Sequence, residues 1–174
     1  NYAPASFAYP EVDWISVNRE FVEHIFDFEP TFFTTQIEPH DWMARHYNEL
    51  ALGNSIKLDL VRDIWGYIQR GVVSQKPEEG ATGSSTMPHK ANPIHFENSE
   101  ANLGIANALY SHLADQLPVS RFQRDLSDSS ALRATGEALG HHTIADKSLQ
   151  RALGQIGVNH NVISDELKDS WAVL

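Results

Sequence analysis

The longest uninterrupted pattern in the chain is a proline-free stretch from His40 to Gln69, in which apolar residues recur at steps of three and four. This spacing predicts one long helix with a packing seam along one face. The seam comprises Met43, Tyr47, Leu50, Asn54, Leu58, Val61, Trp65 and Ile68, with Asn54 as its polar member. About 30 residues of helix span about 45 Å, whereas a compact domain of this size is about 40 Å across. The pattern therefore favours an elongated bundle that shares helices with other subunits.

The remaining segments also predict helices, separated by connections rich in Gly, Pro and Ser. Asp13 is expected to cap a short helix, and Pro39 to occupy the first position of the long one. A second long helix is expected from Pro93 to about Gln116, with one face formed by Ile94, Ala101, Ile105, Leu109 and Leu113.

A third long helix is expected from near Ser129 to Gln155, and a short one from about Asn159. No pair of strands is convincing. The predicted fold class is all-α, with residues 1–174 forming a single helical-bundle domain. Residues 73–93 lack periodicity and are expected to form a flexible loop, and loops of this length are usually functional or disordered.

Composition excludes several classes of protein. The net charge of −10 argues against a general nucleic-acid or anionic-membrane surface, and no apolar run approaches the length of a bilayer span. The absence of cysteine excludes disulfides and thiolate metal sites, and is compatible with the cytoplasm. The chain starts at Asn1 and stops on apolar residues, so both ends are expected to be cut from a longer protein.

The most informative segment runs from Gly83 to Pro93 and reads Gly-Ser-Ser-Thr-Met-Pro-His-Lys-Ala-Asn-Pro. Successive amides of a Gly-Ser-Ser turn can converge on an anion, and Lys90 and Asn92 add a positive charge and an amide donor. Gly-Ser-Ser alone is more typical of a flexible linker. The complete string is far more specific.

This string resembles the signature of the fumarase/aspartase superfamily, Gly-Ser-Ser-x-Met-Pro-x-Lys-x-Asn-Pro, at every fixed position. Histidine before the lysine is more similar to the adenylosuccinate lyase branch and to some cycloisomerases than to fumarases or aspartases. The resemblance implies a β-elimination through a carbanion, with Ser84 as the general base. Lys90 and Asn92 would stabilise the doubly charged intermediate, and Ser85 and Thr86 would bind substrate.

Two flanking segments refine this interpretation. Arg121 to Ser130, followed by Arg133, could hold a phosphate or could simply cap a helix with Arg133 solvated. Ser129 and Arg133 are four residues apart and are expected to share a helix face.

The same segment resembles the nucleotide-binding stretch of adenylosuccinate lyases, which implies that Arg124, Ser129 and Arg133 contact ribose and 5′-phosphate. The segment from Thr35 to Asp41 resembles the family's Gln-x-x-x-His-Asp string and implies that Gln36 contacts substrate. His40 by itself is more typical of a helix start.

The sequence departs from the family pattern in two respects. Ala81 stands where an acidic residue is usual. No histidine matches the family's general acid, which is expected upstream of Asn1, and the adjacent His141 and His142 are interpreted as structural or solvated.

The resemblance as a whole implies a carbon–nitrogen lyase of purine biosynthesis that releases fumarate from adenylosuccinate, giving AMP, and from the succinylated aminoimidazole carboxamide ribonucleotide. It implies a homotetramer in the cytoplasm with no metal or organic cofactor, and a chain that is inactive by itself. Two alternatives remain: another superfamily enzyme such as a carboxymuconate-type cycloisomerase, and a non-catalytic structural homologue.

Overall fold

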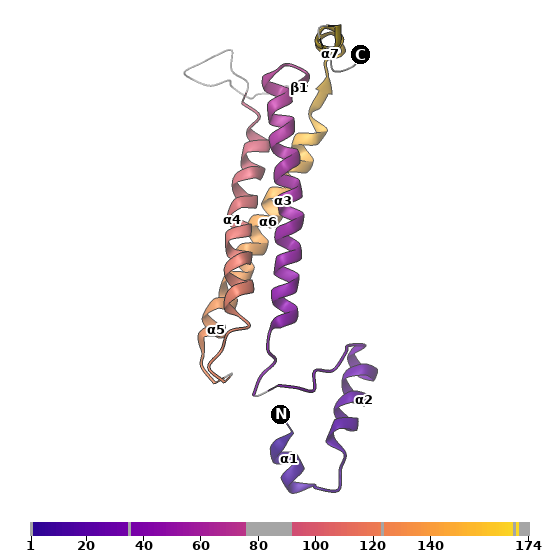
Figure 1. The fold of residues 1–174 in the computed structure, drawn as a ribbon, viewed down its shortest axis with the longest axis vertical. Helices are drawn as coiled ribbons and strands as arrows, with labels where there is room; N and C mark the ends of the chain where they lie inside the picture. The colour runs from indigo at the N-terminus through magenta and orange to yellow at the C-terminus, as the bar shows by residue number, and fades with distance from the viewer. Residues whose placement is uncertain (1, 35, 76–91, 123, 169, 171–174) are drawn as a thin grey trace.

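The computed structural model describes residues 2–34, 36–75, 92–122, 124–168 and 170. Three long helices run side by side (Figure 1). The helices are α1 (Ala3–Ala8), α2 (Trp14–Phe26), α3 (Asp41–Gln69), α4 (Ile94–Gln116), α5 (Ser127–Ala131), α6 (Thr135–Gly154) and α7 (His160–Lys168), with a 3-10 turn η1 (Leu132–Ala134) and strands β1 (Val73–Gln75) and β2 (Ile156–Val158). The predicted all-α class is confirmed.

Helix α3 confirms the predicted long helix, but it begins two residues later than Pro39. His40 precedes the helix with a φ of 61°, in the left-handed region. A left-handed residue cannot continue a right-handed helix, so Pro39 lies outside α3 and its expected place at the first helical position is wrong.

The buried residues of α3 are Ala44, Tyr47, Asn54, Val61 and Ile64, of which Tyr47, Asn54 and Val61 belong to the predicted seam. Trp65, expected within the seam, is 39% exposed. Its indole Nε1 donates to Glu97 at 3.2 Å, which keeps the ring at the rim of the α3–α4 contact.

Helix α4 packs along both α3 and α6 and is the central helix of the bundle. Its buried residues recur at steps of three and four from Phe96 through Ser99, Leu103, Ala106 and Tyr110 to Leu113, and Ala114 is buried beside the last of them. The predicted face was largely wrong, because Ile94 and Ile105 are 65% and 44% exposed and only Leu113 is fully buried. Helix α4 carries apolar residues on more than one side, and its two neighbours determine which side is covered.

The core forms two apolar clusters, one near each end of the bundle. One cluster contains Tyr47, Tyr110 and Leu117, and the other contains Val61 and Phe96. Asn54 lies between Tyr47 and Val61 on α3 and is fully buried.

At about the same level, polar side chains connect the helices. Lys57 Nζ donates to Asp146 Oδ1 at 2.5 Å and lies 3.3 Å from His142 Nε2, and His141 Nδ1 lies 2.7 Å from Asn102 Oδ1. We call Lys57, Asn102, His141, His142 and Asp146 the polar belt. These contacts agree with a structural role for His141 and His142.

A short antiparallel strand pair was not predicted. Val73, Ser74 and Gln75 of β1 pair with Val158, Gly157 and Ile156 of β2. The amide of Asn159 extends the pair by donating to the Val72 carbonyl at 2.9 Å. Three-residue strands are too short to leave a period-two pattern, and β1 falls within the segment expected to be a loop. The rest of that segment up to residue 91 lies outside the described residues.

Helices α1 and α2 lie apart from the three long helices (Figure 1). Asp13 caps α2 as predicted, accepting from the amides of Ile15 and Ser16. The predicted third long helix is divided into α5, η1 and α6, and α7 matches the expected short helix. Of the helices described, none has the length and apolar character needed to cross a membrane.

Replacing Phe96 by Ala should lower the free energy of unfolding by about 3–5 kcal/mol, because the ring is fully buried and a cavity would remain. Phe96→Leu should cost less, since more of the volume is retained. Denaturant unfolding at one fixed protein concentration measures both. Ile94→Ala, at a position 65% exposed in the same helix, is the matched control. Equal losses for Phe96→Ala and Ile94→Ala would contradict the observed face of α4.

Candidate functional site

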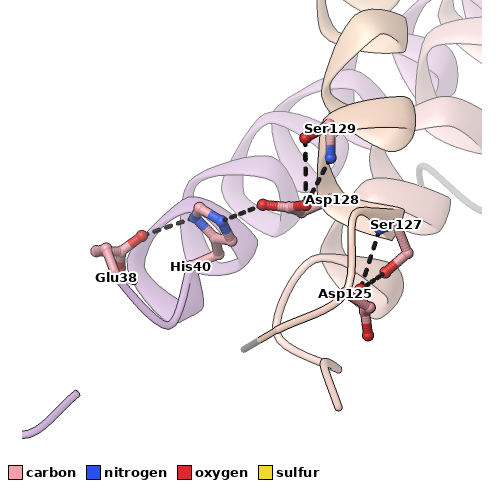
Figure 2. Close-up of polar contacts among 6 residues, drawn as sticks. All are labelled: Glu38, His40, Asp125, Ser127, Asp128 and Ser129. Atoms are coloured by element: carbon pink, nitrogen blue, oxygen red, sulfur yellow. Dashed lines mark hydrogen bonds and ion pairs between the residues drawn. The ribbon is translucent and has the colours of Figure 1, made fainter. Parts of the chain in front are cut away.

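Two segments predicted to contact substrate meet at one end of the bundle. The segment that precedes α3 contributes Glu38 and His40, and α5 contributes Asp128 (Figure 2). His40 Nδ1 lies 2.7 Å from Glu38 Oε2, and His40 Nε2 lies 3.7 Å from Asp128 Oδ2. The imidazole is 14% exposed and lies between the two carboxylates. A protonated imidazole can pair with both carboxylates at once.

Asp128 also contacts the next residue of α5. Its Oδ1 accepts from the Ser129 amide at 2.7 Å and from the Ser129 hydroxyl at 3.4 Å (Figure 2). The carboxylate thus has one oxygen directed to His40 and the other to Ser129. Since Asp128 occupies the Ser129 amide, a phosphate in this region would have to be held mainly by side chains.

Asp125 organises the turn that leads into α5. Its carboxylate accepts from the Ser127 hydroxyl at 2.5 Å, the Ser127 amide at 3.0 Å and the Arg121 amide at 2.9 Å. These hydrogen bonds, led by that of the Ser127 hydroxyl, hold the pKa of the Asp125 carboxyl well below its usual range. The carboxylate therefore stays ionised and keeps the turn closed at neutral pH.

The arginines predicted to bind phosphate are exposed near this turn. Arg124 follows Phe122, which has a φ of 56°, and its amide donates to the Arg121 carbonyl at 3.1 Å. Arg133 lies in η1, and both Arg133 and Ser129 are exposed. Ser129 lies in α5 and Arg133 in the 3-10 turn that follows it, so the helical geometry changes between the two residues. The expected sharing of one regular helix face therefore holds only approximately.

The other predicted residues lie elsewhere. Gln36 is exposed in the segment before α3. Asn92 is exposed just before α4, and its carbonyl accepts from the Ile94 amide at 2.8 Å. Ser84, Ser85, Thr86 and Lys90, and also Ala81, lie outside the described residues.

Asn92 and the Asp128 region lie at opposite ends of the bundle. Contacts such as Trp65 with Glu97 place the start of α4 beside the end of α3, whereas His40 and Asp128 lie where α3 begins. Helix α4 has 23 residues and is therefore about 34 Å long. Within one chain, Asn92 therefore lies too far from Ser129 and Arg133 to contact the same small ligand.

Glu38, Asp125 and Asp128 were not predicted to be parts of the site. Asp125 precedes Ser127 by two residues, and an aspartate that binds the backbone two residues on is a recognisable turn pattern. The contact between His40 and Asp128 has no comparable local signal, since it joins residues far apart in the sequence. Among the described residues, no group of three or more His, Asp or Glu side chains is arranged to hold a metal ion.

Comparison with known proteins gives consistent matches along the chain. A family model described as lyase matches residues 6–109, and one described as adenylosuccinate lyase C-terminal matches residues 120–174. The chain is 49% identical over 175 residues to adenylosuccinate lyase of Escherichia coli K12 and 47% identical over 174 residues to that of Vibrio cholerae. It is 45% identical over 168 residues to the Dictyostelium discoideum protein of the same name.

These alignments cover the whole chain for the two bacterial relatives and 96% of it for the Dictyostelium protein. The chain spans 38% of the length of each bacterial relative and 36% of the Dictyostelium protein.

Substituting Ser127 by Ala should raise the pKa of Asp125 toward its ordinary value near 4, because the largest stabilising hydrogen bond is lost. The folded-state pKa lies below the unfolded one, so the ionised carboxylate stabilises the turn fully above about pH 4 and progressively less as the pH falls. In Ser127→Ala the folded-state pKa lies closer to the unfolded one, so this stabilisation should be smaller and its loss should be complete at a higher pH. Carbon-detected NMR titration of the Asp125 carboxyl measures the shift, with Ser130→Ala as control. An unchanged pKa in Ser127→Ala would refute the assigned cause.

Proposed function

Because this chain belongs to the lyase family, we propose that it supplies the central helical part of a carbon–nitrogen lyase that releases fumarate from adenylosuccinate to give AMP. The same reaction would act on the succinylated aminoimidazole carboxamide ribonucleotide. The observation that carries the proposal is the 45–49% identity, over essentially the whole chain, to proteins named adenylosuccinate lyase. The complete signature from Gly83 to Pro93 supports it.

In the proposed reaction Ser84, as an alkoxide, removes the proton from the carbon beside a carboxylate of the succinyl group. The electron pair first forms an aci-carboxylate, which Lys90 and Asn92 stabilise by charge and by hydrogen bonding. It then forms the carbon–carbon double bond of fumarate as the C–N bond breaks. The leaving nitrogen takes a proton from an acid that no histidine of this chain matches.

Nucleotide binding would involve the end of the bundle at which α5 begins. The exposed side chains of Arg124, Ser129 and Arg133 offer two guanidinium groups and a hydroxyl for a ribose 5′-phosphate. A cycloisomerase acting on a substrate without phosphate has no use for such a group. AMP binding therefore discriminates between the two activities.

The proposed active site would combine segments from different copies of the chain. Asn92 and Arg133 lie at opposite ends of α4, too far apart to contact one nucleotide. Helix α3 also exposes Leu52, Ile56 and Leu60, at steps of four, by 57%, 66% and 42%. An apolar stripe of this kind fits coverage by a second copy. The homotetramer expected for the family meets both requirements, and the proposed cellular site is the cytoplasm.

Ser84→Ala in the complete enzyme should reduce turnover of adenylosuccinate by about 10²–10⁴ while substrate still binds, because only the base is removed. Arg133→Ala should instead weaken the binding of substrate and AMP alike, since a phosphate contact is lost. Steady-state kinetics and AMP titration measure both effects. Near-normal turnover in Ser84→Ala would reject the base assignment, and unaltered AMP affinity in Arg133→Ala would reject the phosphate contact.

Mixing the Ser84→Ala and Arg133→Ala variants should raise activity, measured at a substrate concentration too low to saturate Arg133→Ala, if each site takes Ser84 and Arg133 from different subunits. After dissociation and random reassembly of equal amounts, about one quarter of the sites would contain both native residues. Activity is measured before and after reassembly, with each variant reassembled alone as control. Failure to recover activity in mixed oligomers of confirmed composition would contradict a shared site.

A further inference from the structure

We propose that His40 is a positioning residue that joins the segment carrying Gln36 to the helix carrying Ser129. The inference rests on the proposed function, because it concerns the binding of the nucleotide substrate. His40 is not itself expected to contact substrate. Its role follows from the side chains on either side of its ring.

The first step of the argument is the continuity of the contacts. Glu38 Oε2 lies 2.7 Å from one ring nitrogen of His40, and Asp128 Oδ2 lies 3.7 Å from the other. Asp128 Oδ1 in turn accepts from the Ser129 amide at 2.7 Å. Figure 2 shows this series of contacts running from the segment before α3 into α5.

The second step concerns burial and backbone conformation. The His40 side chain is only 14% exposed, and that of Asp128 is 21% exposed, so the contact is shielded from solvent. His40 also has a φ of 61°, which turns the chain sharply between Glu38 and the first turn of α3. A strained residue is retained where its surroundings hold it, and here the two carboxylates flank its ring.

The third step concerns charge. Asp128 places a negative charge beside Ser129, where the proposed phosphate would bind. The imidazole of His40 lies beside that charge and holds Asp128 toward α3. Loss of His40 would leave the carboxylate, and the Ser129 amide that it binds, free to move, so that the carboxylate could repel or displace the phosphate. The effect of His40 should therefore be on nucleotide binding rather than on the chemical step.

The test uses the complete enzyme with His40→Asn, Asp128→Asn and the double variant. Asparagine tolerates the left-handed conformation. Its amide nitrogen is as many bonds from Cβ as Nδ1 is in histidine, so the contact with Glu38 can persist while the contact with Asp128 is lost. Asp128→Asn keeps an oxygen that can accept from Ser129. Asp115→Asn, which removes one charge from an exposed position near the end of α4, is the matched control.

His40→Asn should raise the KM for adenylosuccinate and the Kd for AMP about tenfold, with kcat changed by less than about twofold. Asp128→Asn should raise both constants by a smaller factor, because it removes the contact with His40 but also the negative charge beside the phosphate. The double variant should bind AMP no more weakly than the single variant with the lower affinity, since both changes break the same contact. The proposal is overturned if either folded single variant binds AMP as tightly as the wild type. It is also overturned if the increases in Kd of the two single variants multiply in the double variant, or if kcat falls while binding is unchanged. Should His40→Asn fail to fold, Asp128→Asn alone decides the outcome by the same criteria.

A measurement without substrate separates this proposal from the proposed function. Amide hydrogen exchange at Ser129 should accelerate at least about tenfold in His40→Asn and not in Asp115→Asn, because Asp128 is no longer held. A wild-type enzyme that neither cleaves adenylosuccinate nor binds AMP would reject the proposed function. Unchanged exchange at Ser129 in His40→Asn would reject the positioning role itself.

Discussion

The burial of α4 between α3 and α6 is the interaction on which the rest of the structure depends. Phe96, Leu103 and Tyr110 are completely buried along α4, and Phe96 and Tyr110 each belong to an apolar cluster that includes residues of both α3 and α6. Removing this much apolar surface from water offsets the entropy lost in ordering long helices. The same packing keeps the helices extended, so segments that follow opposite ends of α4 stay about 34 Å apart. The site proposed here is divided between the ends for this reason.

Local signals predicted the helices well and the choice of buried face poorly. The end of α3 at Gln69 and the Asp13 cap of α2 follow from periodicity and capping, which depend only on neighbouring residues. The buried face of α4 depends on what packs against it, and a sequence with apolar residues on several sides leaves that undecided. The left-handed conformation of His40 and the short pairing of β1 with β2 also depend on tertiary context.

The candidate site shows a similar division. The identities of Ser129, Arg133 and Gln36 came from resemblance to a family, and the sequence by itself left capping and phosphate binding as alternatives. The carboxylates around His40 could not be predicted, because the fold brings Glu38 and Asp128 to one ring from distant parts of the chain. The role of Asp125 in the turn could have been predicted from the sequence, since its hydrogen bonds with Ser127 are local.

The polar belt gives the bundle a register that its apolar seam alone would not define. Tyr47, Asn54 and Val61 repeat every seven residues, so sliding α3 by one repeat, about 10 Å, would return its seam to a similar apolar environment. The same slide would separate Lys57 from Asp146 and leave partly buried charges unpaired, which is costly. It would also break the 2.9 Å contact between the Tyr47 hydroxyl and Thr135 Oγ1. Thr135 directly follows η1 and α5, so the register that these contacts fix is also the one that places Asp128 of α5 beside His40 at the start of α3.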